Sequence, residues 1–419
     1  MDIELLTIGD ELLLGFTIDT NAAHLARELA AIGIGMRRRG TVGDVAEDIA
    51  TAVAEALDRT GAVITTGGLG PTSDDLTKAS IASIFGRGMR LDEEHVAWME
   101  QRWQQRFGRR MPESNRAQAM LPEGARKLTN NHGSAPGIWL EDDRGRWVAM
   151  LPGVPREMRG MLADTLLPVL RERASRDGAS TVVRSRTLRT TGVAESLLAD
   201  QIDPIRDSLG PISLAYLPAP DGVDLRLTIR DVAANQADEL LDAASNVISG
   251  RLGRSIYAEG ATDLAEVVLD RCRSLGLTLS VAESCTGGLL GARLTAIPGS
   301  SDVFFGGVIA YANEVKRDLL DVDQKLLDAH GAVSEEVVRQ MAEGARARLC
   351  TSLGIGITGI AGPGGGTPEK PVGTVWVALA HQDGTRAVQL RLIGDRDEIR
   401  RRATQSALEL VRRTLLEKD

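Results

Sequence analysis

The chain has 419 residues, of which 43% are hydrophobic and 26% charged, so it is a globular protein with room for two to four domains rather than a disordered or fibrous one. Its net charge of −9 argues against a general nucleic-acid binder, although glycine loops can still bind phosphate locally. The three cysteines, Cys272, Cys285 and Cys350, suggest no disulfide framework. The acidic N-terminus does not resemble a signal peptide, and no apolar stretch reaches the roughly 20 residues of a membrane span. We therefore expect a cytoplasmic protein with no membrane partner.

The first part of the chain predicts an α/β domain. Apolar runs at 3–8 and 62–66 are typical of strands, and helical periodicity lies between them. Thr20 is expected to cap the first helix, and Asp44 with Glu47 the second. Strands that alternate with helices favour a mostly parallel sheet covered on both faces.

The strand at 62–66 runs into a glycine-rich loop, GGLGPT (67–72), where a ligand can approach the backbone closely. The loop is neither a Walker loop nor a GxGxxG motif. Asp74 and Asp75 follow at the start of the next helix, and adjacent carboxylates beside a phosphate loop suit a hard divalent metal ion. Asp74 could equally serve only as a helix cap. Other acidic residues at strand or helix ends, where site residues collect, are Asp10, Glu11, Asp19 and Glu157.

A polar stretch at 174–179 is interpreted as a linker, and a small α+β unit follows it. Its pattern is strand, helix, strand, strand, helix, strand. The tetrapeptide GRLG (250–253) has the form of the GxxG loop of KH domains, but a nucleic-acid KH loop should join two helices. Because this tetrapeptide leads into a strand at 255–257, we predict a structural spacer.

The α/β pattern restarts near residue 260 and places two glycine loops after strands. The first, ESCTGG (283–288), opens a helix, so its backbone N–H groups can hold an oxyanion or a phosphate. The second, TGIAGPGGG (358–366), lets a ligand approach the backbone, but it could also be a plain hairpin connection. Ser334 is expected to cap a later helix.

Ser284 is the candidate nucleophile of the first loop, and Lys316 is its candidate base. A serine needs a base, and a lysine base must be neutral, which requires a pKa about three units lower through burial or a cationic neighbour. A Ser–Lys pair is an accepted variant of the catalytic triad. The plainer alternative is that Ser284 caps the helix and Lys316 lies on a solvated helix face. Cys285 is a rival nucleophile, although a free cysteine is more often a small core residue.

Six motifs give the C-terminal part a family resemblance: AESCTGG, YANEVK, HGAVSEE, ITGIAGPGGG, KPVGTVW and GDRDEIRRRA. In this order, over about 260–415, they resemble the CinA C-terminal family, the nicotinamide mononucleotide deamidases. The resemblance implies hydrolysis of nicotinamide mononucleotide to nicotinate mononucleotide and ammonia, with no cofactor. It implies Ser284 as nucleophile and Lys316 as base, with Tyr311, Asn313 and Thr358 in the catalytic set. The implied substrate-binding residues are Thr286, Gly287, Gly288, Gly359, Gly362 and an arginine, either Arg396 or Arg400.

The motifs IGDELLLG, DTN, TTGGLGPTSDDLT, NHGSAPG and LPGVPREM, over about 1–170, resemble the CinA N-terminal domain. That domain is similar in fold to the molybdopterin-binding proteins of molybdenum-cofactor synthesis. The resemblance implies an ADP-ribose pyrophosphatase that needs a divalent ion of the Mg, Mn or Co class, held by Asp74, Asp75 and Glu157. The implied nucleotide-binding residues are Asp10, Asn21, Gly67, Gly68, Gly70, Pro71, Thr72 and Gly153. TTGVAESLL in the middle segment resembles the KH-like linker domain of the same family.

The sequence thus predicts two α/β domains with mainly parallel sheets, at 1–174 and 260–416, joined by a small KH-like α+β domain at 180–257. We expect a homodimer that acts on nicotinamide mononucleotide and ADP-ribose in pyridine-nucleotide recycling and does not bind nucleic acid strongly. Two alternatives stay open: a competence-associated interaction protein, as the family name suggests, and an N-terminal domain that binds a pterin or a nucleotide without splitting it. The acidic chain, which lacks a basic stripe, favours the enzyme.

Overall fold

The computed structural model describes residues 1–72, 74–176 and 181–417, and no helix in these ranges is both long and apolar enough to cross a membrane. Contacts divide the chain into two compact units, and each is described by itself. One unit is Met1–Arg184 with Ile229–Glu239, and the other is Ser185–Thr228 with Leu240–Asp419. Half of the predicted linker at 174–179, residues 177–179, lies outside the described part.

The N-terminal sheet has six strands in the order β2-β1-β3-β8-β7-β6. Strands β2, β1, β3 and β8 are parallel, and β7 and β6 are antiparallel. The strands of this domain, including a separate β4–β5 pair, are β1 (Asp2–Ile8), β2 (Gly35–Val42), β3 (Ala62–Thr66), β4 (Met89–Leu91), β5 (Met120–Pro122), β6 (Arg126–Leu128), β7 (Gly137–Glu141) and β8 (Trp147–Leu151). The predicted mixed α/β architecture, with a sheet that is mainly parallel, is confirmed.

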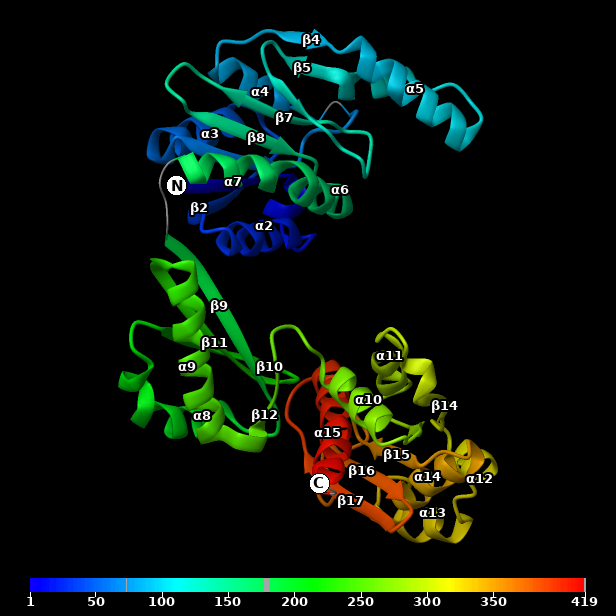
Figure 1. The fold of residues 1–419 in the computed structure, drawn as a ribbon. Coiled ribbons are helices and arrows are strands. Elements are labelled where there is room, and N and C mark those ends of the chain that lie inside the picture. Colours follow the sequence, from blue (N-terminus) through cyan, green and yellow to red (C-terminus); the bar gives the residue numbers. More distant parts are fainter. Residues whose placement is uncertain (73, 177–180, 418–419) are drawn as a thin grey trace. The chain divides into compact units, whose positions relative to one another are not determined.

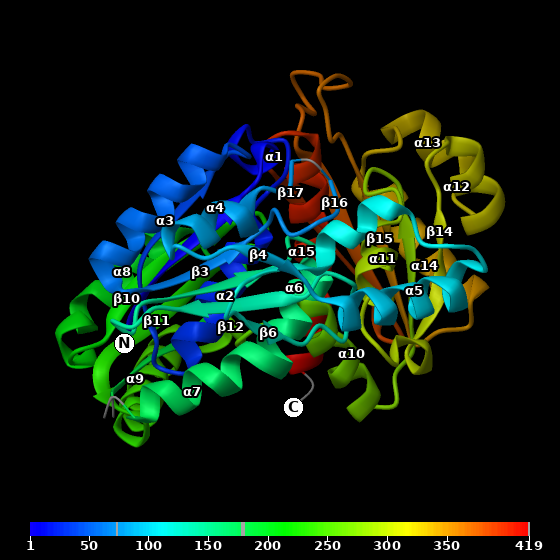
Figure 2. The same cartoon turned by 90° about the horizontal axis from the view of Figure 1, so that it is seen from above.

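Helices cover both faces of this sheet because alternate residues of its central strands are buried on opposite sides. Leu5 packs with α2, α6 and α7, whereas the next residue, Leu6, packs with α3 and α4. Figure 2 shows α3 and α4 on one side of β3 and α7 on the other. The helices of the domain are α1 (Asp10–Leu13), α2 (Thr20–Ala31), α3 (Ala46–Thr60), α4 (Thr77–Ile84), α5 (Glu93–Phe107), α6 (Pro155–Met161) and α7 (Leu167–Arg176). In Figure 1, α5 extends outward from the rest of the domain.

Two predicted helix caps in this domain are wrong. Helix α2 is capped by Asp19, whose side chain accepts from the backbone N–H of Ala22 at 2.9 Å, so Thr20 is the first helical residue. Helix α3 has no side-chain cap. Asp44 instead exchanges side-chain-to-backbone hydrogen bonds with Asp10, at 3.0 and 3.2 Å, because the ends of β1 and β2 bring the two residues together.

The middle segment forms a four-stranded sheet in the order β10-β11-β9-β12. Its elements are β9 (Thr181–Thr190), α8 (Glu195–Ile202), β10 (Ser213–Ala219), β11 (Gly222–Ala233), α9 (Ala234–Leu252) and β12 (Ile256–Glu259). The GRLG tetrapeptide ends α9 and leads through one helical turn into β12, as predicted. It therefore does not join two helices, as the loop of a nucleic-acid KH domain does.

The C-terminal sheet has five strands in the order β14-β13-β15-β16-β17, of which the first three are parallel and the last two antiparallel. Helices α10, α11 and α15 cover one face, and α12, α13 and α14 lie against the other. Ser334 caps α14, as predicted. The strands are β13 (Leu279–Glu283), β14 (Phe304–Ile309), β15 (Leu353–Gly359), β16 (Thr374–His381) and β17 (Gly384–Arg391). The helices are α10 (Leu264–Ser274), α11 (Leu289–Thr295), α12 (Asn313–Leu320), α13 (Gln324–His330), α14 (Glu335–Arg348) and α15 (Arg396–Leu416).

Candidate active sites

The carboxyl ends of the three parallel strands of the C-terminal sheet meet at one cavity of about 200 Å³. Ser284 follows β13, Tyr311 follows β14, and Thr358 lies at the end of β15. Open α/β sheets generally bind ligands at this edge. The predicted residues that line the cavity are Ser284, Tyr311, Asn313, Lys316, Thr358, Gly359 and Arg396. The structure therefore brings together all five residues of the predicted catalytic set.

Lys316 is buried in the wall of this cavity, so the alternative of a solvated lysine is wrong. Its side chain is 1% exposed, and its Nζ donates to the carbonyl oxygens of Ala310 at 2.8 Å and Tyr311 at 3.1 Å. Burial lowers the pKa of Lys316, while Cys285 and Glu314 act in the opposite direction. A neutral amine has two N–H donors and one lone pair. The two carbonyls can thus take both hydrogens and leave the lone pair for a proton from serine.

Helix α11 is capped by Glu283 and not by Ser284. The buried Glu283 carboxylate accepts hydrogen bonds from the backbone N–H groups of Gly288, Leu290 and Gly291, at 3.1, 3.0 and 2.8 Å. A carboxylate is favourable at a helix N-terminus because the free N–H groups and the helix dipole both stabilise negative charge. Sequence reasoning missed this role. The sequence feature that could have predicted it is an acidic residue at the end of a strand, directly before a glycine turn that begins a helix.

The turn after Ser284 offers fewer free N–H donors than the sequence suggests. The N–H of Gly287 donates to the carbonyl oxygen of Ser284 at 3.1 Å, and the N–H of Gly288 donates to Glu283. The expectation that these two glycines bind substrate through their N–H groups is therefore corrected. Their φ angles of 60° and 93° show that their part is to shape the turn. Within the described residues, the N–H groups of Cys285 and Thr286 donate to no backbone carbonyl, so these two can face an oxyanion.

Cys285 also lines the cavity, but it packs in the hydrophobic core. It is 5% exposed, and burial raises the pKa of its thiol to about 12. The thiolate is the nucleophilic form of cysteine, so a thiol that stays protonated at neutral pH is a poor nucleophile. The structure thus favours Ser284 over Cys285.

Two arginines at the start of α15 hold the two glycine loops. Arg396 donates to the carbonyl oxygen of Gly362 at 2.6 Å and to the Tyr311 hydroxyl at 3.3 Å. Arg400, one turn later, donates to the carbonyl oxygen of Thr286 at 2.8 Å. Of these two arginines, Arg396 lines the cavity and Arg400 does not.

The N-terminal domain has a larger cavity, of about 550 Å³, at the carboxyl ends of its parallel strands. The predicted residues that line it are Glu11, Asp19, Asn21, Gly67, Gly68, Gly70, Pro71, Thr72, Asp74, Asp75, Gly153 and Glu157. Asp10 does not line it, because its side chain faces Asp44. Asn21 joins two loops of the cavity by donating to the carbonyl oxygen of Gly153 at 2.7 Å and to the Thr66 hydroxyl at 3.3 Å.

The three predicted metal ligands do not form a metal centre of their own. Both carboxylate oxygens of Asp75 are taken by the glycine loop: one accepts from the N–H of Gly70 at 2.7 Å, the other from the N–H and hydroxyl of Thr72 at 2.8 and 2.6 Å. Glu157 accepts from the Asn130 amide at 2.7 Å. Among the described residues, no group of three or more His, Cys, Asp or Glu side chains could hold a metal ion. Asp75 is thus better explained as a residue that shapes the loop than as a ligand.

Comparisons with known proteins agree along the whole chain. Three family models match it: "Probable molybdopterin binding domain" over residues 4–172, "Damage-inducible protein CinA KH domain" over 185–258, and "CinA C-terminal domain" over 261–415. A "CinA-like protein" of Gemmatimonas aurantiaca is 64% identical over 99% of this chain and 96% of its own length. A "Putative competence-damage inducible protein" of Symbiobacterium thermophilum is 44% identical over 99% of both chains. Among solved structures, the competence/damage inducible protein CihA from Agrobacterium tumefaciens is 42% identical, covers 36% of this chain and 93% of its own, and has a TM-score of 0.36.

Proposed function

The chain belongs to the CinA family, and on this basis we propose that its C-terminal domain hydrolyses the carboxamide of nicotinamide mononucleotide. The observation that carries the proposal is that Ser284 and the buried Lys316 line one cavity at the carboxyl edge of the sheet. A serine hydroxyl becomes a nucleophile only beside a base, and a lysine becomes a base only where its pKa is lowered, as it is here.

In the proposed reaction, the Ser284 oxygen attacks the carboxamide carbon while neutral Lys316 takes the hydroxyl proton. The negative charge that develops on the carboxamide oxygen is stabilised by the N–H groups of Cys285 and Thr286. Protonated Lys316 then gives its proton to the leaving ammonia, and an acyl-serine ester remains. Water, deprotonated by Lys316, attacks this ester, and nicotinate mononucleotide leaves as Ser284 recovers its proton.

The size and charge of the cavity support a nucleotide substrate. Its volume of about 200 Å³ lies below the roughly 300–1,000 Å³ of most small-molecule sites. It can therefore enclose the reacting carboxamide end of the substrate while the sugar and phosphate extend along the rim. The rim carries Tyr311, which is 63% exposed, and the guanidinium of Arg396. A guanidinium can bind a phosphate through two parallel hydrogen bonds.

Substrate comparison tests this proposal. We expect purified protein to release ammonia from nicotinamide mononucleotide and to release at least about tenfold less from nicotinamide riboside, which lacks the phosphate. Arg396→Met should raise KM for the mononucleotide much more than it raises KM for the riboside. Equal rates with both substrates would contradict the phosphate-binding role of Arg396, and no ammonia from either would contradict the amidase.

We also propose that the N-terminal cavity binds ADP-ribose and hydrolyses its diphosphate with one water molecule to give AMP and ribose 5-phosphate. The observation in its favour is the glycine loop after β3, which lines the cavity and lets a phosphate approach the backbone closely. A divalent ion, when bound, would neutralise charge on the diphosphate. Magnesium commonly takes one or two carboxylates and completes its shell with substrate phosphates and water, so Asp74 and Glu157 on the cavity wall could suffice.

A further inference from the structure

Another cavity, of about 540 Å³, lies within the second compact unit, between the middle domain and helix α15. Loops at 191–194 and 220–222 of the middle domain form one side of it. The apolar side chains on the other side come from β16, β17 and α15 and the loop before α15: Val377, Val388, Leu390, Leu392 and Leu410. Its volume and its largely apolar wall are those of a small-molecule site, and none of the residues proposed above for either reaction lines it.

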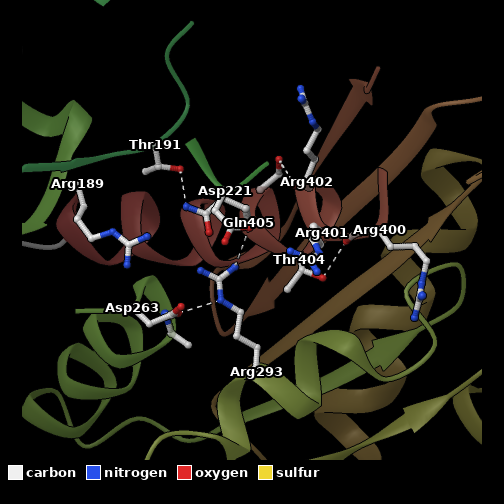
Figure 3. Close-up of polar contacts among 12 residues, drawn as sticks. Arg189, Thr191, Asp221, Asp263, Arg293, Arg400, Arg401, Arg402, Thr404 and Gln405 are labelled. Carbon is white, nitrogen blue, oxygen red and sulfur yellow. Dashed lines mark hydrogen bonds and ion pairs between the residues drawn. The ribbon is translucent and has the colours of Figure 1, made fainter. Parts of the chain in front are cut away.

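Hydrogen bonds join the two sides of this cavity. Gln405, in the middle of α15, donates through Nε2 to the Thr191 hydroxyl at 3.0 Å, and Figure 3 shows its side chain directed toward that residue. Farther along the helix, Arg412 donates to the carbonyl oxygen of Arg254 at 2.6 Å. The two sides of the cavity are therefore held together by hydrogen bonds within this compact unit.

Two polar atoms at this cavity are buried without a hydrogen-bond partner among the described residues. One is Oε1 of Gln405, whose side chain is 5% exposed, and the other is Nε of Arg402. Both residues line the cavity, and Figure 3 shows the Arg402 side chain extending away from α15. A buried acceptor and a buried donor without partners are unfavourable unless a ligand or water satisfies them. Together they call for a ligand that both donates and accepts hydrogen bonds.

Most charged side chains that line the cavity already have an ionic partner. Glu409 already accepts from Arg413 and Arg412, and Asp221 lies 3.9 Å from Arg293. Of the other arginines in the lining, Arg386 lies 3.4 Å from Glu417. Arg402 has no carboxylate partner in the described part of the chain. An anionic group is the natural partner of such a guanidinium.

We infer that this cavity binds a small aromatic anion of mononucleotide size. The ring lies against the apolar side chains of β17, a donor group on the ring edge binds Oε1 of Gln405, and the anionic group binds Arg402. AMP meets all three requirements, because adenine has apolar faces and an amino donor and the phosphate carries the charge. The inference does not depend on either proposed hydrolase activity.

Hydrogen–deuterium exchange of the full-length protein with AMP tests the inference locally. We expect AMP to slow exchange in two segments, 191–194 and 402–413, and we expect adenosine and inorganic phosphate to need at least about tenfold higher concentration for the same protection. Arg402→Met should weaken the AMP effect at both segments at least about tenfold, and Arg402→Lys should weaken it less. Arg401→Met is the matched control, because Arg401 is on the same helix, exposed and paired with Asp397 at 2.8 Å.

Three results would overturn the inference. One is that neither segment is protected at about 10 mM AMP, even if AMP protects the N-terminal domain. Another is an equal AMP dependence in the wild type and Arg402→Met. The last is protection by inorganic phosphate as strong as that by AMP, which would reduce the cavity to a simple anion site. Segment 191–194 lies at this cavity and at neither hydrolase cavity, so AMP binding at the amidase cavity, which α15 also lines, does not reproduce protection of both segments.

Discussion

At the scale of single residues, the burial of Lys316 is what turns a pair of common residues into a candidate catalytic pair. Because burial lowers the pKa of Lys316, the neutral amine forms at pH values below 10.5, the ordinary pKa of lysine. Since only the neutral form accepts a proton from Ser284, kcat should rise with pH through the pKa of Lys316 and then level off. A pH profile of ammonia release with a midpoint clearly below 10.5 is expected. A rate that falls over the same range would contradict a lysine base.

Cys285 provides a second test at this scale. Its thiol stays protonated at neutral pH because burial raises its pKa to about 12, so Cys285→Ala should keep kcat within about threefold of the wild type. Removing a small buried side chain should cost only about 1 kcal/mol of unfolding free energy. If the variant lost all activity at an unchanged melting temperature, the nucleophile would be the cysteine.

The sequence predicted the residues of the C-terminal site better than their individual roles. Ser284, Tyr311 and Thr358 could be placed together because they follow three strands that end at one sheet edge. The burial of Lys316 and the capping bonds of Glu283 could not be foreseen, because both depend on how α11 and α12 pack against the sheet.

At the scale of elements, the strand–turn–helix unit β13–α11 depends on the Glu283 carboxylate. Glu283→Gln keeps the shape of the side chain but removes its charge and turns an amide N–H₂ toward backbone donors. We expect a loss of about 2 kcal/mol of unfolding free energy, measured by chemical denaturation, together with lower amidase activity because the Ser284 turn is displaced. Glu266→Gln is the control, because Glu266 is a half-buried acidic residue on neighbouring α10. Unchanged stability in Glu283→Gln would show that the three hydrogen bonds do not hold the turn.

In the N-terminal domain, the glycine loop after β3 depends in a comparable way on the Asp75 carboxylate. Because Asp75 accepts three hydrogen bonds from Gly70 and Thr72, Asp75→Asn should disorder the loop and weaken ADP-ribose binding at least about tenfold. The loss should be the same with excess chelator as with a divalent ion, when binding is followed by calorimetry. A loss seen only when the ion is present would instead restore Asp75 as a metal ligand.

Helix ends were the weakest sequence predictions at this scale. Asp19 and Thr20 are adjacent and both are suitable caps, so the pattern alone could not choose between them. Asp44 was assigned to α3, but the parallel pairing of β1 and β2 brings it to Asp10, a residue 34 positions away.

At the scale of the whole molecule, the fold class followed from the alternation of strands and helices at both ends of the chain. Buried parallel strands read as continuous apolar runs, and both α/β sheets contain them. The cavity beside α15 had no sequence signal, because its lining joins the middle domain to β16, β17 and α15, which are far apart from it along the chain. Such a site can be found only from the packed structure.

The central claim is that Ser284 and Lys316 hydrolyse the amide of a pyridine nucleotide. The most direct test is ammonia release from nicotinamide mononucleotide by the wild type, Ser284→Ala and Lys316→Arg. Ser274→Ala and Lys325→Arg are matched controls at exposed positions. We expect Ser284→Ala and Lys316→Arg each to lose at least about a hundredfold in kcat, since the first lacks the nucleophile and the second cannot become neutral, while both controls keep full activity. Full activity in either site variant, with the protein folded, would contradict the account.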